Sequence, residues 1–293
     1  ILKKYGADIL RIWVASSNYA EDLRIDYSIL DQHADSYRKI RNTFRYLLGN
    51  INDNFDNINL NELDLNKLPE LEQFMLHKIF VLNDKFKKYF KNYDFHNLYK
   101  ELLNFCTVDL SAFYFDIRKD NLYCDDKESK KRKSTIKVLN IILNTLLKWF
   151  APILSFTTEE IHKLLIKDQK SIHLEKFLEI PNKFKNEKIN EKWIELIKIR
   201  NICNISIEEK RASKEIGSSL EASLKIELNQ KLKNLTENTD FSELCITSNA
   251  NINYKDNIET TAITSKAKGS KCSICWKVKE TACGRSNCAV NLE

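Results

Sequence analysis

Residues that turn or break a polypeptide backbone are scarce in this chain, which has 5 Gly and 3 Pro among 293 residues. That scarcity disfavours a turn-rich all-β fold and favours long helices. From residue 28 onward, apolar side chains recur at spacings of three, four and seven, which places them on one face of a helix. The first such set is Leu30, Ala34, Tyr37, Phe44, Leu47 and Leu48. We therefore expect a mainly α-helical fold.

Helix start and stop signals divide the first part of the chain into helices joined by loops. The signals are Gly49 as a stop, Pro69 as a start, Asp94 as an N-cap, Pro152 as a stop, and Thr157 with Glu160 as a capping box. The predicted helices cover residues 7–16, 28–49, 69–90, 94–108, 134–150 and 157–166. Helices of this length with modest loops favour an antiparallel helical bundle over residues 28–167.

After residue 167 the pattern becomes mixed, and residues 168–265 are predicted to form a small α/β junction domain. A helical period covers 190–213, whereas 221–228 alternate as a strand with Ala222, Leu224, Ile226 and Leu228 on one side. Further strand candidates are 173–177, 243–249 and 258–265. Residues 1–27 are short and mixed in pattern, and 266–293 would form a terminal module.

Composition indicates a soluble protein with a possible nucleic-acid partner. The chain is 43% hydrophobic and 30% charged, and it has no run of about 18 apolar residues that could span a membrane. It starts with neither Met nor a signal peptide, so we interpret it as part of a longer cytoplasmic protein and expect a monomer. The formal net charge of +6 permits nucleic acid as a partner without requiring it.

Four of the 8 cysteines lie in the last 22 residues, and they predict a structural zinc site. Cys272 and Cys275 form a C-x2-C pair, and Cys283 and Cys288 form a wider C-x4-C pair. Zinc prefers four tetrahedral thiolate or imidazole ligands, and a module this short needs such a staple to fold. One Zn²⁺ with four thiolates has no open position for catalysis. Free thiols in a disordered tail, a disulfide or a cluster are the alternatives.

Cations surround these cysteines and suit a phosphate-bearing partner. The basic residues closest to the predicted ligands are Lys271, Lys277 and Arg285. Trp276 directly follows a ligand and has two interpretations. It either packs against a module without a core of its own, or it offers an exposed face on which a base could stack.

An arginine stripe lies on the first bundle helix, where Arg38, Arg41 and Arg45 follow spacings of three and four. Arginine suits phosphates and base edges, although a solvated face with local ion pairs is the ordinary reason for such a stripe. The basic run 130–133 is interpreted as an exposed loop. No catalytic site is predicted, because the 5 His residues are dispersed and no Gly-rich phosphate loop is present.

Several segments together resemble the class I isoleucyl-tRNA synthetase family. They are residues 5–11, 37–43, 93–95, 105–114, 151–154, 158–161, 216–222 and 271–276. The resemblance implies that residues 1–27 link to a catalytic domain and that the bundle is an anticodon-binding domain that contacts tRNA(Ile). It also implies that the catalytic and editing domains, with ATP and Mg²⁺, lie outside this sequence. The family's terminal motif is often Cys-Gly-Arg-Cys, whereas Ser286 stands at the last of those places here and Cys288 follows two residues later.

Two other functions are consistent with the same residues. One is a stand-alone zinc-ribbon protein that binds nucleic acid, and the other is a helical scaffold with a zinc-stapled tail. Within the family resemblance, valyl- and leucyl-type enzymes have a similar bundle. The terminal cysteine module after residues 216–222 favours the isoleucyl type.

Overall fold

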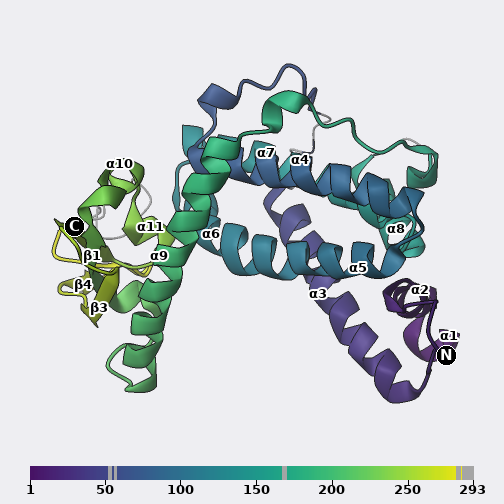
Figure 1. The fold of residues 1–293 in the computed structure, drawn as a ribbon, viewed down its shortest axis with the longest axis horizontal. Coiled ribbons are helices and arrows are strands. Elements are labelled where there is room, and N and C mark those ends of the chain that lie inside the picture. Colours follow the sequence, from purple (N-terminus) through teal and green to yellow (C-terminus); the bar gives the residue numbers. More distant parts are fainter. Residues whose placement is uncertain (52–54, 56–57, 167–169, 282–284, 286–293) are drawn as a thin grey trace. The chain divides into compact units, whose positions relative to one another are not determined.

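A computed structural model of the chain describes all residues except 52–54, 56–57, 167–169, 282–284 and 286–293 (Figure 1). Helices predominate and a small sheet accompanies them, which confirms the mainly α prediction. The chain forms two compact units. The first contains Ile1–Phe115 and Lys133–Lys185, and the second contains Asp116–Arg132 and Asn186–Glu293. In the described residues, no helix is long and apolar enough to cross a membrane.

The first unit is helical throughout. Its helices are α1 (Leu2–Tyr5), α2 (Ala7–Ser16), α3 (Tyr27–Ile51), α4 (Glu70–Lys91), α5 (Phe95–Asn104), the π-helical η3 (Phe105–Phe115), the greater part of α7 (Lys130–Phe150) and α8 (Ser155–Leu165). Short 3-10 turns complete it at η2 (Leu65–Lys67), η4 (Ile172–Leu174) and η5 (Asn182–Phe184). The predicted helix 7–16 is confirmed, as are the starts at Pro69 and Asp94, where the Asp94 carboxylate accepts the Asn97 N–H at 3.2 Å.

Aromatic side chains from several helices form the core of this unit. Trp149 on α7 packs edge-on against Phe86 on α4, with 4.7 Å between the ring centroids, and against Phe105 at 6.0 Å. The Trp149 indole N–H donates to the Asn83 side-chain oxygen at 3.2 Å, so its one polar atom is satisfied inside the core. Burial of these large rings holds α4, α7 and η3 together.

Four helix boundaries differ from the prediction. The predicted end at 108 is wrong because helical structure continues through η3 to Phe115, and the basic run 130–133, predicted as an exposed loop, is the first turn of α7. The other two errors have a physical reason. Gly49 does not end α3, which continues to Ile51 because Leu47 and Ile51, four residues apart, are both fully buried. Thr157 does not open α8 with a capping box, because α8 begins at Ser155. The Thr157 hydroxyl donates instead to the Asp8 carboxylate at 2.6 Å.

Asp8 caps α8 from a distant position in the sequence. Its buried carboxylate accepts the backbone N–H groups of Thr157 at 2.8 Å and Phe156 at 3.3 Å, in addition to the Thr157 hydroxyl. A negative charge is favoured at a helix N-terminus, where backbone N–H groups lack partners. On the same helix as Asp8, Arg11 donates to the carbonyls of Pro152 at 2.6 Å and Ile153 at 2.9 Å. Together, Asp8 and Arg11 fix α2 to the turn between α7 and α8.

We expect Asp8→Ala to lower the free energy of unfolding by about 2 kcal/mol, because it leaves buried N–H and hydroxyl groups without an acceptor. Urea unfolding followed by tryptophan fluorescence measures the change. Asp31→Ala is the matched control, since Asp31 is 61% exposed and pairs with Lys4 at 3.7 Å. Its expected effect is below about 0.5 kcal/mol. Equal losses in the two variants would contradict the role of Asp8.

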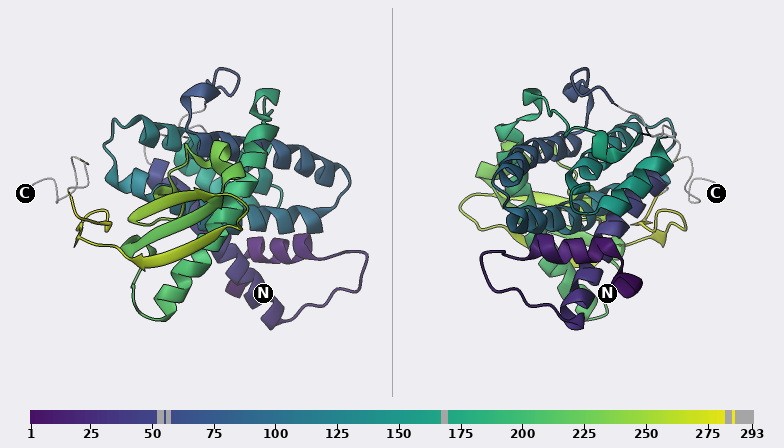
Figure 2. Two further views of the ribbon diagram at one scale, coloured as in Figure 1. Left: turned by 60° about the vertical axis from the view of Figure 1, so that its left-hand side comes forward. Right: turned by 90° about the vertical axis from the view of Figure 1, so that its right-hand side faces the viewer.

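The second unit packs one long helix against a three-stranded sheet (Figure 2). Its helices are α6 (Asp116–Cys124), α9 (Glu187–Ala212), α10 (Lys233–Thr236) and α11 (Phe241–Leu244), with 3-10 turns η6 (Ser219–Glu221) and η7 (Gln230–Leu232). The strands are β1 (Ala222–Asn229), β2 (Asn249–Lys255), β3 (Thr261–Lys266), β4 (Ser270–Lys271) and β5 (Val278–Lys279). The strand order is β2-β1-β3, and β4 pairs with β5 in a separate hairpin.

Strand β1 confirms the predicted alternation. Ala222, Leu224, Ile226 and Leu228 are all buried, and β1 pairs parallel with β2 and antiparallel with β3. The predicted strand 173–177 is wrong, because a 3-10 turn lies there. The strand predicted at 243–249 begins only at Asn249, since the Asp240 side chain accepts the N–H groups of Ser242 at 2.9 Å and Glu243 at 3.1 Å and starts α11 instead.

Candidate functional site

The arginine stripe of α3 is on the surface of the first unit. Arg38, Arg41 and Arg45 are all exposed, whereas the opposite side of the helix buries Ile40, Phe44 and Leu47. The three- and four-residue spacing predicted that the arginines share one stripe of the helix, and the structure places this stripe away from the buried side, not beside it. The stripe therefore presents guanidinium groups to solvent along a rigid helix.

The arginines differ in their partners. Arg38 pairs with Asp35 one turn earlier on the same helix and also donates to the Ala34 carbonyl at 3.4 Å, which is the local ion pairing expected of an ordinary solvated face. Arg41 and Arg45 form no ion pair or hydrogen bond with any residue that the structure describes. Two adjacent unpaired guanidinium groups with fork geometry suit a phosphate-bearing ligand.

The C-x2-C pair lies in the turn between β4 and β5. The Cys272 N–H donates to the Lys277 carbonyl at 2.9 Å, and the Trp276 N–H donates to the Cys272 carbonyl at 3.0 Å. Trp276 has a φ of 62°, a left-handed conformation that bends the chain back after Cys275. Gly269 also has a positive φ, of 113°, and an added Cβ there would stand 2.1 Å from the Lys279 carbonyl oxygen. This tight turn brings two thiols to one place.

The side chains of Cys272 and Cys275 are both buried. A third buried thiol, that of Cys124 at the end of α6, joins them in one cluster. Burial raises the pKa of Cys124 to about 11, so this thiol is protonated at neutral pH. The predicted ligands Cys283 and Cys288 lie outside the described residues. Within the described ranges, no three His, Cys, Asp or Glu side chains are arranged to hold a metal ion.

The basic residues of the terminal module lie in different surroundings. Arg285 donates to both carboxylate oxygens of Asp120 at 2.7 and 2.5 Å and pairs with Asp125 at 3.2 Å. Lys277 is 3.7 Å from the same Asp120 carboxylate, and Lys271 pairs with Glu221 at 3.1 Å. Burial, the largest single influence, would raise the pKa of Asp120. The hydrogen bonds from Arg285 and the positive charges of Lys277 and Arg285 together outweigh burial and hold that pKa below its usual range.

The contacts of Arg285 and Lys277 with Asp120 fix the terminal module to α6. Trp276 is 60% exposed, so much of its ring faces solvent, and the stacking of a base on it stays a prediction. Sequence reasoning missed Asp120, Asp125 and Cys124 as neighbours of the cysteine turn. No local signal could reveal them, because Asp120 and Arg285 are 165 positions apart in the chain.

Comparison with known proteins gives consistent similarities. A family profile described as the anticodon-binding domain of tRNA ligase matches residues 72–228. The isoleucine–tRNA ligase of Pelagibacter ubique (strain HTCC1062) is 70% identical over 285 residues, which cover 97% of this chain and 32% of the relative. Those of Bartonella henselae and Agrobacterium fabrum are 38% and 40% identical over 94% and 85% of this chain, or 29% and 25% of their own lengths. The chain thus spans about a third or less of the curated relatives it matches.

Proposed function

Because the chain belongs to the family of anticodon-binding domains of tRNA ligases, we propose that it holds the tRNA substrate of an isoleucine–tRNA ligase. The whole enzyme would act in the cytoplasm, activate isoleucine with ATP and Mg²⁺, and transfer it to tRNA(Ile). This chain would supply affinity and anticodon discrimination and leave the chemistry to a catalytic domain elsewhere. Its contribution to the rate would be to position the tRNA so that the acceptor end reaches that domain.

The unpaired guanidinium groups of Arg41 and Arg45 carry the proposal. They lie on one exposed face of α3, in a helical unit that also contains much of the family match. Arg38, in contrast, pairs locally with Asp35 on the same helix. Arg41 and Arg45 have no such partner among the described residues, so they are available to RNA phosphates or base edges.

We also propose one structural Zn²⁺ per chain in the terminal module, held by Cys272, Cys275, Cys283 and Cys288. Cys272 and Cys275 fit such a site, because both side chains are buried in one tight turn. Zn²⁺ would supply folding energy to a segment that has little core of its own. Trp276 beside this turn, together with Lys271, Lys277 and Arg285, would then belong to a surface shaped by the metal.

Binding measurements with the whole 293-residue chain test the proposal. We expect salt-dependent binding of tRNA(Ile) that exceeds binding of single-stranded DNA and duplex DNA in a gel-shift series, and no isoleucine-dependent pyrophosphate exchange. Equal affinity for the three nucleic acids would favour a generic zinc-ribbon protein, and no binding would favour a scaffold. Parallel titrations with tRNA(Val) and tRNA(Leu) separate the isoleucyl type from its relatives.

A further inference from the structure

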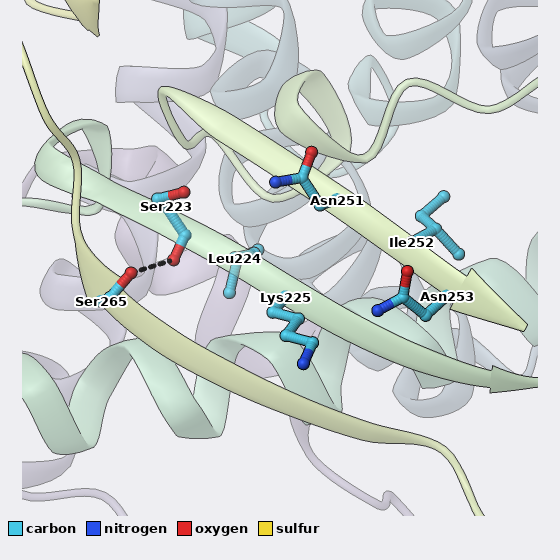
Figure 3. Close-up of a pocket in the computed structure, with 7 residues that line it drawn as sticks. All are labelled: Ser223, Leu224, Lys225, Asn251, Ile252, Asn253 and Ser265. Atoms are coloured by element: carbon cyan, nitrogen blue, oxygen red, sulfur yellow. Dashed lines mark hydrogen bonds between the residues drawn. The ribbon is translucent and has the colours of Figure 1, made fainter.

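One face of the three-stranded sheet in the second unit carries a regular grid of mostly polar side chains, which are exposed or half-exposed, with Ile263 as its apolar member. Across the strands, Asn251 on β2 is opposite Lys225 on β1, which is opposite Ile263 on β3. The rows before and after it are Asn249, Ser223 and Ser265, and Asn253, Glu227 and Thr261. Figure 3 shows part of this grid, with the amides of Asn251 and Asn253 on the strand beside Lys225. The other face of β1 is the buried one.

The amides on β2 are unusual for a strand. Asn249, Asn251 and Asn253 occupy alternate positions and are all exposed, although asparagine is depleted in strands. A solvated sheet face is common and is ordinarily filled by residues that favour strands, such as threonine. None of the three amide groups hydrogen bonds to another side chain in the described part of the protein. The three amide groups therefore offer hydrogen-bond donors and acceptors to a ligand from a regular strand. Asparagine has a low propensity for strands, and such a departure from local propensity is typical of functional surfaces.

Lysines border the grid on the side of the cysteine turn. A shallow hollow continues from the sheet over Ser223, Asn249 and Ser265 to Lys266, Lys268 and Lys279, and Glu280 and Thr281 also line it. These three lysines form no ion pair with the residues that the structure describes. Glu227 within the grid already accepts Lys255 at 2.7 Å. The surface thus combines the cations of Lys225, Lys266, Lys268 and Lys279 with exposed amide and hydroxyl groups. It also contains the carboxylates of Glu227 and Glu280 and the apolar Ile263, and its lysines outnumber its carboxylates.

We propose that this sheet face binds the sugar–phosphate backbone of RNA. This inference rests on the proposed function, and it names the part of the RNA that the second unit contacts. Lysine ammonium groups neutralise phosphates, and side-chain amides and hydroxyls donate to phosphate oxygens and 2′-hydroxyls. The grid has no aromatic ring, so it provides nothing for bases to stack on. It is suited to the wide, shallow groove of an A-form stem, whose shape it would recognise whatever the base sequence.

The test compares two variants with the same substitutions at different places. The first variant, Lys225→Glu with Asn251→Asp, changes the grid. The second, Lys233→Glu with Asn234→Asp, changes α10. This helix contacts β2 through a 2.8 Å hydrogen bond between Thr236 Oγ1 and Tyr254 Oη and contributes no residue to the grid. Affinity for a tRNA(Ile) transcript is measured by fluorescence anisotropy at several salt concentrations, with the whole chain. Circular dichroism and thermal melting show that both variants are folded.

We expect the grid variant to bind about tenfold more weakly and with a shallower salt dependence, and the α10 variant to bind almost as the parent does. The loss should persist on a tRNA whose stem base pairs are exchanged, because the backbone is unchanged. Equal affinities of the two variants, with tRNA binding intact, would overturn the sheet proposal alone. A parent chain that binds no tRNA would overturn the proposed function and this inference with it. A loss confined to one stem sequence would show base reading and would also overturn it.

Discussion

Replacing Arg41 and Arg45 by glutamine should weaken tRNA binding by about 30- to 100-fold, because two charge-assisted hydrogen bonds to RNA would be lost. The dependence of affinity on salt should also become shallower by about one to two counterions. The fold should be unaffected, since both side chains are exposed and have no partner among the described residues. Anisotropy titrations of labelled tRNA(Ile) at several salt concentrations measure both quantities.

A matched pair of lysines supplies the control for this experiment. Lys87 and Lys91 on α4 are exposed, four residues apart, and belong to the same unit. Lys87→Gln with Lys91→Gln removes the same charge at the same helical spacing, so the loss of net charge alone is matched. Similar losses of affinity in the two double variants would mean that general charge, and not the α3 stripe, attracts the RNA. Arg38→Gln should have a smaller effect, because Asp35 already pairs with Arg38.

Signals in the sequence correctly predicted those helices and strands whose position depends on residues close by in the chain. Asp94 caps α5 through a neighbouring N–H group, and the alternation of residues 221–228 is the inward-facing pattern of β1. Predictions failed where a distant residue competes. Asp8, about 150 positions from Thr157, takes the hydroxyl that a capping box would use. Ile51 carries α3 past Gly49 because its burial outweighs the lower helix propensity of glycine.

The candidate sites likewise combine features that local spacing predicted with features that depend on distant residues. Helical spacing alone placed Arg38, Arg41 and Arg45 together on an exposed stripe. Spacing could not say which of them is paired, since that depends on where the neighbouring carboxylates lie. Nor could it place Arg285 against Asp120, or Cys124 against the cysteine turn, because α6 meets the terminal module only in the folded chain. The polar sheet grid likewise depends on the register of three strands, which hydrophobic alternation does not determine.

Cys272→Ser should abolish zinc binding, taking the metal content from about one Zn per chain to near zero, because a structural site needs all of its ligands. The substituted turn should also become sensitive to trypsin at Lys277 and Lys279, since metal binding and folding are coupled in so short a module. Elemental analysis after gel filtration measures the metal, and timed proteolysis measures the folding of the module. Cys106→Ser is a control, because Cys106 is buried in η3 of the first unit and should leave the metal in place.

Two further serine variants identify the fourth ligand. Cys288→Ser should lose the metal as Cys272→Ser does, despite the wide C-x4-C spacing, because zinc favours four ligands and no histidine is near in the sequence. Cys124→Ser should keep the metal, since Cys124 contacts the C-x2-C pair without completing a metal-holding group among the described residues. The reverse result, with zinc retained in Cys288→Ser and lost in Cys124→Ser, would transfer the fourth position to α6. Full zinc content in Cys272→Ser would refute the site itself.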